Sequence, residues 1–351
     1  MTVPISTDQN RRPVRRAAVA GLLIGGAIVG FVLSRFGLPH ILAALRNLGF
    51  AGFGAIVGFQ LALAAGAGLA WWLLGYGRPD ARPWRFVWGR LVRDAAAQAL
   101  PLSHLGGVVL GSRALALAGV SGRFAAASSI VDMAVELITE LVYAMVGLGL
   151  LAVLQPRSAL LLPSLLGLVM MAILASLFAL MQTRGERLIS WLPLAWQASA
   201  HRRAAAFRDA YSEVRRDRLA LGLAGASHLG CWMLTGLQAW LTLRLMGAPL
   251  PLLPCIVIDS LTFGLRSLAF MVPGALGVQE GAFVLLGGLF GLSPHAAIAL
   301  SLARRGRDLA IALPALAGWH YQEGRRLWRW GARSANPGQR PSPLPGSMPF
   351  E

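Results

Sequence analysis

The chain has 351 residues, of which 56% are hydrophobic and 13% are charged, and its formal net charge is +17 at pH 7. Soluble domains carry about 25% charged residues, so this composition excludes an ordinary water-soluble protein and predicts a polytopic membrane protein. All 32 basic residues are arginines. In a membrane chain this charge reflects loop topology and attraction to anionic inner-leaflet lipids, and we therefore expect no nucleic-acid partner.

Six apolar runs are long enough to cross a bilayer as helices, because one crossing takes about 20 residues. They lie at 17–36, 50–76, 124–154, 159–182, 219–247 and 294–322. The first run follows a cluster of arginines but lacks a small-residue cleavage site. We therefore expect a retained anchor there rather than a signal peptide.

Two further stretches, 94–122 and 252–292, are apolar but interrupted by proline and glycine. Interrupted helices occur at membrane depth where protein or a water-filled cavity satisfies the freed backbone groups. Each stretch is predicted to form either a pair of short spans or a re-entrant hairpin. The expected fold is an all-α polytopic membrane protein with about six full transmembrane helices and two interrupted hairpins.

The placement of arginines predicts the orientation. With the N-terminus inside, 23 of the 32 arginines fall on the cytoplasmic side. They lie in the basic N-terminal segment 1–16, in 78–93, at Arg123, in 184–218 and after residue 322. The positive-inside rule then predicts that both termini are cytoplasmic.

We expect a single transmembrane domain at 17–325, followed by a disordered tail, rich in proline and glycine, at 334–351. The loop 184–218 interleaves aromatic residues with arginines. This pattern is typical either of an amphipathic helix on the inner membrane surface or of an ordinary basic loop.

An internal repeat is visible when the chain is slid on itself by 172 residues, which aligns Gly119 with Gly291 without a gap. We expect two repeats, at about 50–154 and 219–322. Because an odd number of predicted crossings separates the two hairpins, the second repeat is predicted to be inverted. Many transporters use inverted repeats to alternate access to a site near the membrane midplane.

The second interrupted stretch contains a Pro- and Gly-rich motif in which Pro273 ends one helix and Gly277 precedes the next. Gln279 and Glu280 follow, and they could hydrogen-bond to a hydroxylated or cationic headgroup. The alternative is that Glu280 caps the N-terminus of the following half-helix, where the helix dipole favours a carboxylate.

Two groups of charges fall at membrane depth, where exposure to lipid costs about 2.5–3.5 kcal/mol for each charge. The acidic stripe on the third run consists of Asp132, Glu136 and Glu140, spaced by four. The charged group of the last run consists of Arg304, Arg305, Arg307 and Asp308. We hypothesise that the acidic stripe pairs with this group between the repeats, as a static clamp or as a hydrated path that breaks and reforms. Within the last run, Arg304 and Asp308 are spaced for an intrahelical pair.

Three further charges accompany the interrupted stretches: Arg113 on the first, and Asp259 and Arg266 on the second. The spacing of Asp259 and Arg266 does not favour a local pair, and these three residues are predicted either to line the cavity or to lie near an interface. The two cysteines and the scattered histidines form no metal-ligand spacing, so we expect no metal and no cofactor.

A family resemblance rests on residues 272–281, 300–305 and 319–323 of the second half, and on 100–107 and 119–132 of the first. These motifs resemble the flippase-like membrane domain of the lysylphosphatidylglycerol synthase superfamily. More narrowly, they resemble the hopanoid-biosynthesis-associated membrane proteins of bacteria.

The resemblance implies a multi-pass protein of the bacterial inner membrane that moves a hopanoid between leaflets or towards the outer membrane, without being an enzyme. It also implies that hopanoid-pathway enzymes are candidate partners. Relatives often carry an acidic residue where this chain has Val108, which lies opposite Glu280 at the 172-residue offset. Glu280 is therefore left without a symmetric carboxylate.

The leading hypothesis is a transporter whose lipid path includes Glu280, Gln279 and the charged group of the last run. A second hypothesis is a membrane-embedded lipid-modifying transferase with Glu280 or Asp132 as general base, although the sequence contains no nucleophile or metal constellation for it. A third is a scaffold that holds hopanoid-synthesis enzymes through the loop 184–218. The oligomeric state is left open.

Overall fold

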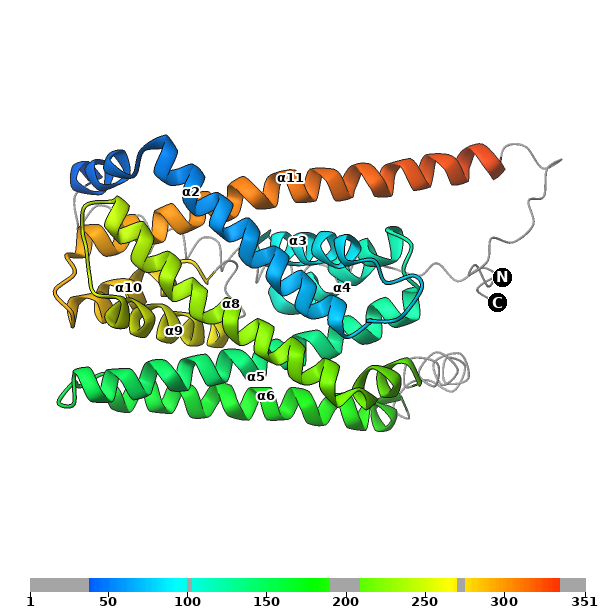
Figure 1. Ribbon diagram of the computed structural model, residues 1–351, viewed down its shortest axis with the longest axis horizontal. Coiled ribbons are helices and arrows are strands. Elements are labelled where there is room, and N and C mark those ends of the chain that lie inside the picture. Colours follow the sequence, from blue (N-terminus) through cyan, green and yellow to red (C-terminus); the bar gives the residue numbers. More distant parts are fainter. Residues whose placement is uncertain (1–37, 100–102, 190–208, 270–274, 335–351) are drawn as a thin grey trace, which may run out of the picture.

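The computed structural model describes residues 38–99, 103–189, 209–269 and 275–334, and within these ranges the chain is helical and contains no strand (Figure 1). Several expectations fall outside the described residues. They concern the N-terminal segment 1–16, the first span 17–36, the tail beyond 334, Pro273 and most of the loop 184–218.

The first four described helices form a long, short, short, long series. They are α2 (Leu38–Leu73), α3 (Pro83–Ala99), α4 (Ser103–Leu117) and α5 (Gly122–Leu154). α2 is broken at Gly49, which has a φ of 60°. α6 (Leu161–Ile189) follows α5.

The same series then recurs. It consists of α8 (Arg218–Leu245), α9 (Leu252–Leu268), α10 (Val278–Gly288) and α11 (Pro294–Ser334). The starts of α5 and α11 lie 172 residues apart. Each is preceded by a glycine in the left-handed region, Gly119 with a φ of 99° and Gly291 with a φ of 78°. Only glycine adopts this conformation readily, so both turns depend on the missing side chain.

The two four-helix sets run in opposite directions (Figure 1). α2 and α8 cross each other antiparallel, and α5 and α11 also run in opposite senses. The α3–α4 hairpin lies at one end of the molecule and the α9–α10 hairpin at the other. The packing is reciprocal, because α5 contacts α9 of the second set and α11 contacts α3 of the first.

Among the described residues, four helices are long and apolar enough to cross a membrane. These spans are Leu45–Leu73, Gly122–Leu154, Leu161–Leu180 and Arg218–Leu245. They correspond to four of the predicted runs. The predicted run 294–322 is helical, as part of α11, but because of its charged residues it is not among the four helices that are apolar enough to cross a membrane. The protein is therefore an all-helical, multi-pass membrane protein.

The two interrupted stretches form the pairs α3–α4 and α9–α10, but α3 begins earlier than the predicted boundary at residue 94. Pro83 occupies its first position, where proline fits a helix because the missing N–H would have no intrahelical partner. The prediction of a cytoplasmic loop at 78–93 is therefore wrong for Arg90 and Arg93. Both lie on α3, because an amphipathic helix can bury arginines that meet carboxylates.

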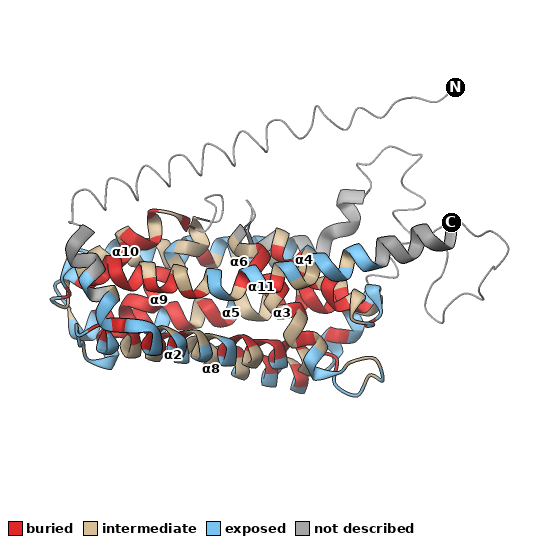
Figure 2. Ribbon diagram, turned by 90° about the horizontal axis from the view of Figure 1, so that it is seen from above, coloured by how far each residue is buried: buried red, intermediate tan, exposed pale blue. Residues whose placement is uncertain are grey.

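Apolar packing is divided between the two ends of the molecule. One core surrounds Trp71 and Phe86 on α2 and α3, and the other surrounds Ile258 and Phe283 on α9 and α10. Buried residues line α9 and α10 in Figure 2. By contrast, α6 exposes leucines such as Leu166 along its length, as expected of a helix in contact with lipid. The space between the two cores is polar.

Candidate functional site: a charged cavity between the two helix sets

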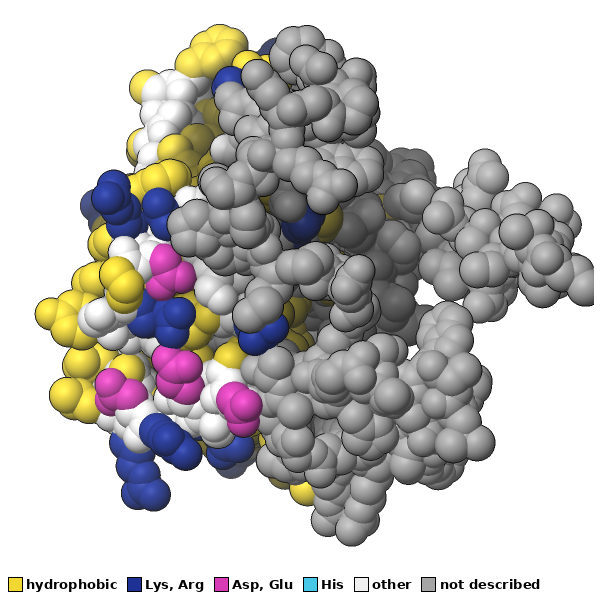
Figure 3. All heavy atoms as spheres, turned by 90° about the vertical axis from the view of Figure 1, so that its right-hand side faces the viewer, with side chains coloured by type: hydrophobic (Ala, Val, Ile, Leu, Met, Phe, Trp, Pro, Cys, Tyr) yellow, Lys and Arg dark blue, Asp and Glu magenta, His cyan; other side chains and the backbone are white. Residues whose placement is uncertain are grey.

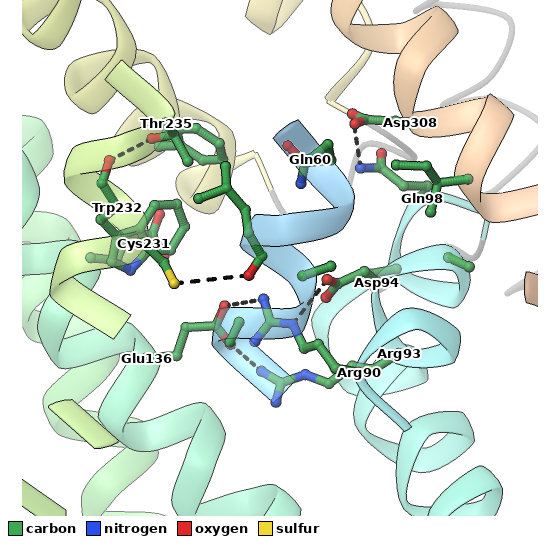
Figure 4. Close-up of a pocket in the computed structure, with 18 of the residues that line it drawn as sticks. Gln60, Arg90, Arg93, Asp94, Gln98, Glu136, Cys231, Trp232, Thr235 and Asp308 are labelled. Carbon is green, nitrogen blue, oxygen red and sulfur yellow. Dashed lines mark hydrogen bonds and ion pairs between the residues drawn. The ribbon is translucent and has the colours of Figure 1, made fainter. Parts of the chain in front are cut away.

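A polar cavity of about 220 Å³ lies between the two helix sets. Its walls come from α2, α3, α5, α8, α9 and α11, so both sets contribute to it. A cavity needs about 10–15 Å³ to hold one water, so this one has room for several waters or for a polar headgroup. Figure 4 shows polar side chains from several of these helices converging on it. We call it the central cavity.

The wall between α3 and α5 is an ion-pair network. Arg93 binds Asp132 at 2.6 Å and also pairs with Glu136. Arg90 binds Glu136 at 2.6 Å and Asp94 at 2.9 Å. Figure 4 shows both guanidinium groups directed at Glu136. These contacts compensate charges that would be costly to bury singly.

His228 of α8 adds a further contact to this network, because its Nε2 lies 2.9 Å from Asp132. Both side chains are buried. The histidine therefore belongs to the wall of the central cavity, although its place in the sequence gave no sign of a role.

The opposite wall is a second network, between α9 and α11. Arg304 pairs with Asp259, which also accepts hydrogen bonds from Tyr143 at 2.9 Å and from Thr235 at 2.5 Å. Nearby on α11, Arg307 binds the neighbouring Asp308 at 2.7 Å. Three donors thus surround the fully buried carboxylate of Asp259, and Arg307 and Asp308 form a separate pair beside it.

Two further contacts tie α11 to other helices. Arg307 donates a hydrogen bond to Gln238 of α8, and Gln98 of α3 donates one to Asp308 at 3.3 Å. Figure 4 shows Gln98 and Asp308 facing each other at the edge of the cavity.

The predicted direct pairing between the acidic stripe and the charged group of the last run is wrong in the described residues. Asp132 and Glu136 pair with α3, and Glu140 accepts a hydrogen bond from Ser267 of α9. The predicted pair of Arg304 with Asp308 is also not formed, because Arg304 turns to α9. Members of both groups nevertheless line the same cavity: Glu136 and Glu140 of the stripe, and Arg304, Arg307 and Asp308 of the last run.

Glu280 lies in a buried cluster outside the lining of the central cavity. Its carboxylate accepts the backbone N–H of Gly277 at 2.8 Å, the Ser301 hydroxyl at 2.8 Å and the Nε–H of Arg305 at 2.7 Å. Gln279 donates to the same Ser301 at 2.6 Å. The capping alternative therefore describes this glutamate: it closes the first turn of α10 and holds that helix to α11.

The remaining predicted residues separate into two places. Arg266 lines the central cavity and stacks over Phe263 at 5.3 Å. Arg113 does not line it, but binds Glu323 at 2.7 Å near the end of the molecule where α11 leaves the bundle.

Four buried polar atoms around the central cavity have no hydrogen-bond partner among the described residues. They are Gln60 Oε1, Arg90 Nη1, Trp232 Nε1 and Arg304 Nη1. Gln60 and Trp232 lie on the crossing helices α2 and α8, at positions 172 residues apart. Buried polar atoms are nearly always hydrogen-bonded, so this set indicates a site for water or a polar ligand.

An apolar recess of about 210 Å³ lies on the other face of α9. Leu261, Gly264 and Leu268 of α9 line it together with residues of α5, α6 and α10 such as Met171 and Leu286. α9 therefore separates a polar compartment from an apolar one.

Sequence reasoning missed Gln60, Arg90, Arg93, Asp94 and His228 as cavity residues. The signal that could have found the arginines is their spacing of three, which places them on one helical face with Asp94 beside them. Gln60 and His228 are single polar residues in apolar runs, and only the packing of α2 against α8 and α5 reveals their role. Among the described residues, no group of three or more His, Cys, Asp or Glu could hold a metal ion.

Comparison with protein families gives one match, to the lysylphosphatidylglycerol synthase TM region, over residues 18–316. Comparisons with curated proteins and with solved structures gave no match. The family match covers the first helix set, the second set as far as residue 316 of α11, and the residues that line the central cavity. The chain therefore belongs to the family of the lysylphosphatidylglycerol synthase transmembrane region, which indicates a function related to membrane lipids.

Proposed function

We propose that this protein moves an amphipathic lipid between the two leaflets of a membrane without changing it chemically, and that the lipid is a hopanoid. The observation that carries the proposal is a polar cavity at the centre of two oppositely directed helix sets, lined by both of them. A site with this placement can open to either leaflet through rearrangement of one set against the other.

The charges of the cavity suit a neutral headgroup. Arg90, Arg93, Arg304 and Arg307 are all ion-paired in the walls. The walls also contain hydrogen-bonding atoms without a partner among the described residues. The donors are Arg90 Nη1, Trp232 Nε1 and Arg304 Nη1, and the acceptor is Gln60 Oε1. A hydroxylated side chain needs both donors and acceptors, which this cavity supplies. An anionic headgroup would find one unpaired arginine among the described residues, Arg266, in a cavity that is also lined by four carboxylates.

The apolar recess supports the amphipathic character of the cargo. A lipid has a polar end and an apolar body, and the two compartments on either side of α9 match these two ends. Transfer of the apolar body from lipid to a recess of similar polarity requires little free energy, so the headgroup dominates the barrier to movement.

We place the end of the molecule shown in Figure 3 in the cytoplasm of a bacterial inner membrane. Arginines gather on this face together with acidic residues. Two arginine–glutamate pairs lie outside the central cavity: Arg78 of the loop between α2 and α3 binds Glu213 at 2.8 Å, and Arg113 of α4 binds Glu323. The positive-inside rule supports this orientation, and anionic inner-leaflet lipids are the partners expected at this face.

Reconstitution tests the proposal. Liposomes containing the protein and a labelled hopanoid with a hydroxylated side chain should redistribute the label between leaflets faster than protein-free liposomes. A hopanoid without the hydroxylated side chain and a labelled phosphatidylglycerol serve as comparison lipids. Faster movement of phosphatidylglycerol alone would reject the hopanoid, and chemical change of the label would reject transport in favour of a transferase.

Trp232→Phe provides a matched variant for this assay, because it removes the unpaired Nε1–H donor and keeps an aromatic ring. Its control is Trp84→Phe, at a side chain that is 57% exposed on α3 and outside the central cavity. Loss of the hopanoid signal in Trp232→Phe and its retention in Trp84→Phe would locate the headgroup in the cavity.

A further inference from the structure

Glu140 differs from every other carboxylate around the central cavity. It lines the cavity from α5 and is 3% exposed. Ser267 Oγ donates a hydrogen bond to it, and among the described residues no arginine or histidine nitrogen lies within ion-pair distance of it. By contrast, the carboxylates of Asp94, Glu136 and Asp308 each pair with an arginine.

A buried carboxylate without a cation is unfavourable in its ionised form. Burial removes water from the charge, and a single neutral hydroxyl replaces only part of the lost solvation. A carboxyl group in this situation avoids the penalty by binding a proton. Asp, Glu and His side chains at membrane depth form the proton relays of many pumps and transporters.

We propose that Glu140 is a proton-binding site of the central cavity, and that its proton couples the movement of the lipid to the proton gradient across the membrane. The coupling rests on the proposed transport function, whereas the proton site does not. The step moves one proton: an O–H bond of a hydronium ion on one side of the membrane breaks as the O–H bond of the Glu140 carboxyl group forms. That O–H bond then breaks as a water on the other side accepts the proton and becomes hydronium.

Arg266 supplies the means of coupling. It precedes Ser267 on α9, lines the cavity and stacks over Phe263. Among the described residues, no carboxylate lies within ion-pair distance of Arg266. The arginine next to Ser267, the hydrogen-bond donor to Glu140, is therefore itself unpaired. An ionised Glu140 can turn to Arg266, and a headgroup bound at Arg266 excludes that pair. Headgroup binding and proton binding therefore favour each other, and this linkage is reciprocal.

Other charged and titratable groups also face Glu140. On its own helix α5, Glu136 lies one turn away and Tyr143 lies on the side towards α9. The groups presented by the helices around the cavity are Cys231 and His228 of α8, Arg266 of α9, Arg90, Arg93 and Asp94 of α3, and Arg304, Arg307 and Asp308 of α11. The other four arginines of this group are already ion-paired with carboxylates, so among the described residues Arg266 is the cavity arginine whose charge is not yet paired.

The site is present in only one helix set. At the 172-residue offset the counterpart of Glu140 is Ala312, which also lines the cavity. By contrast, the preceding stripe residue Glu136 has the acidic counterpart Asp308. One proton site for each chain is therefore expected, and it breaks the symmetry of the two sets.

The proposal that Glu140 binds a proton can be tested without any transport assay. Infrared spectra of the purified protein in nanodiscs at pH 7 should contain the C=O stretching band of a protonated carboxyl group. Glu140→Gln should remove that band, whereas Asp94→Asn, which changes a carboxylate paired with Arg90, should leave it. If wild type and Glu140→Gln give the same band intensity, the proton site is rejected. Ser267→Ala serves as a second variant, because losing the donor should shift the frequency of the same band.

Coupling is tested in liposomes with an imposed pH difference. The wild-type protein should move lipid several-fold faster under a gradient of one sign than without a gradient, and Glu140→Gln should respond to neither sign. Lipid movement by wild type that is insensitive to the gradient overturns the coupling. If wild type moves no lipid under any gradient, the proposed transport function fails, and the infrared band still decides whether Glu140 binds a proton.

Discussion

Asp132 of α5 and Arg304 of α11 occupy equivalent positions in the two helix sets and carry opposite charges. Each is neutralised by the first short helix of its own set, Asp132 by Arg93 of α3 and Arg304 by Asp259 of α9. The repeats therefore preserve an ion pair between the same two helices while exchanging its signs. This explains why the two walls of the cavity together are close to neutral.

Breaking one of these pairs should destabilise the protein strongly. Asp259→Leu leaves Arg304 buried without its carboxylate, and the expected loss is about 3–5 kcal/mol of unfolding free energy. The double variant Asp259→Leu with Arg304→Met should lose less than the sum of the two single variants, because no unpaired charge remains. Thermal unfolding in detergent measures all three. Additive losses would contradict a direct pair.

Glu280→Gln tests whether this residue acts on the lipid or on the fold. Because Glu280 caps α10 and binds Arg305, the variant should lower the unfolding free energy by about 1–3 kcal/mol. The folded fraction should still move lipid. The measurement is transport per folded molecule, with folding followed by size-exclusion chromatography. A fully folded variant without transport would return Glu280 to the lipid path.

Gly68 permits close contact between α2 and α3, and a side chain there should be harmful. A Cβ atom at this position would lie 2.6 Å from the Val87 Cα atom. Gly68→Ala should therefore lower the melting temperature. At Gly58 on the same helix a Cβ atom would meet nothing within 4 Å, so Gly58→Ala is the control and should be neutral or stabilise by up to about 1 kcal/mol. Equal effects of both changes would contradict the packing of α2 on α3.

Asp80 makes stability depend on pH at the loop between α2 and α3. Burial raises the pKa of its carboxyl, but the backbone N–H of Ser121 and the charge of Arg78 lower it more, and the net pKa lies below the ordinary value of 3.8. A depressed pKa stabilises the folded state above the unfolded value, and this contribution disappears as the pH falls through the folded value.

The difference in melting temperature between wild type and Asp80→Asn should therefore be constant near neutral pH and shrink below pH 3.8. Differential scanning fluorimetry across this range measures it. Arg82→Gln, at an arginine of the same loop, is the control for general loss of loop charge. A difference that grows on acidification would contradict the assigned contacts of Asp80.

Composition and hydropathy were sufficient to predict an all-helical membrane protein and the approximate bounds of α5, α6 and α8. They failed at α3, because hydropathy counts an arginine as polar wherever it lies. The spacing of Arg90 and Arg93 indicates a shared helical face, but it does not reveal that Arg93 meets Asp132 of another helix. The partner of Glu136 was also wrong in the prediction. Spacing along one helix reveals a charged face, but only tertiary packing decides which neighbouring helix meets that face.

The two readings of Glu280 show the same limit. A carboxylate after a glycine-rich turn at the start of a helix is compatible both with capping and with ligand binding. The backbone N–H of Gly277 and the side chains of Ser301 and Arg305 distinguish them, and the latter two lie on another helix. The sequence therefore identified an important position without its function.

Among the described residues α6 has no counterpart in the first helix set, and its crossing accounts for the opposite directions of the two sets. Each set contains two long helices and a hairpin, so a chain that completes one set returns to the side from which it started. Without α6, α8 would begin beside the start of α2, and the second set would be a parallel copy with both hairpins at one end. One long apolar helix between the described parts of the two sets, with leucines exposed along its length, is thus enough to turn the second set over relative to the first.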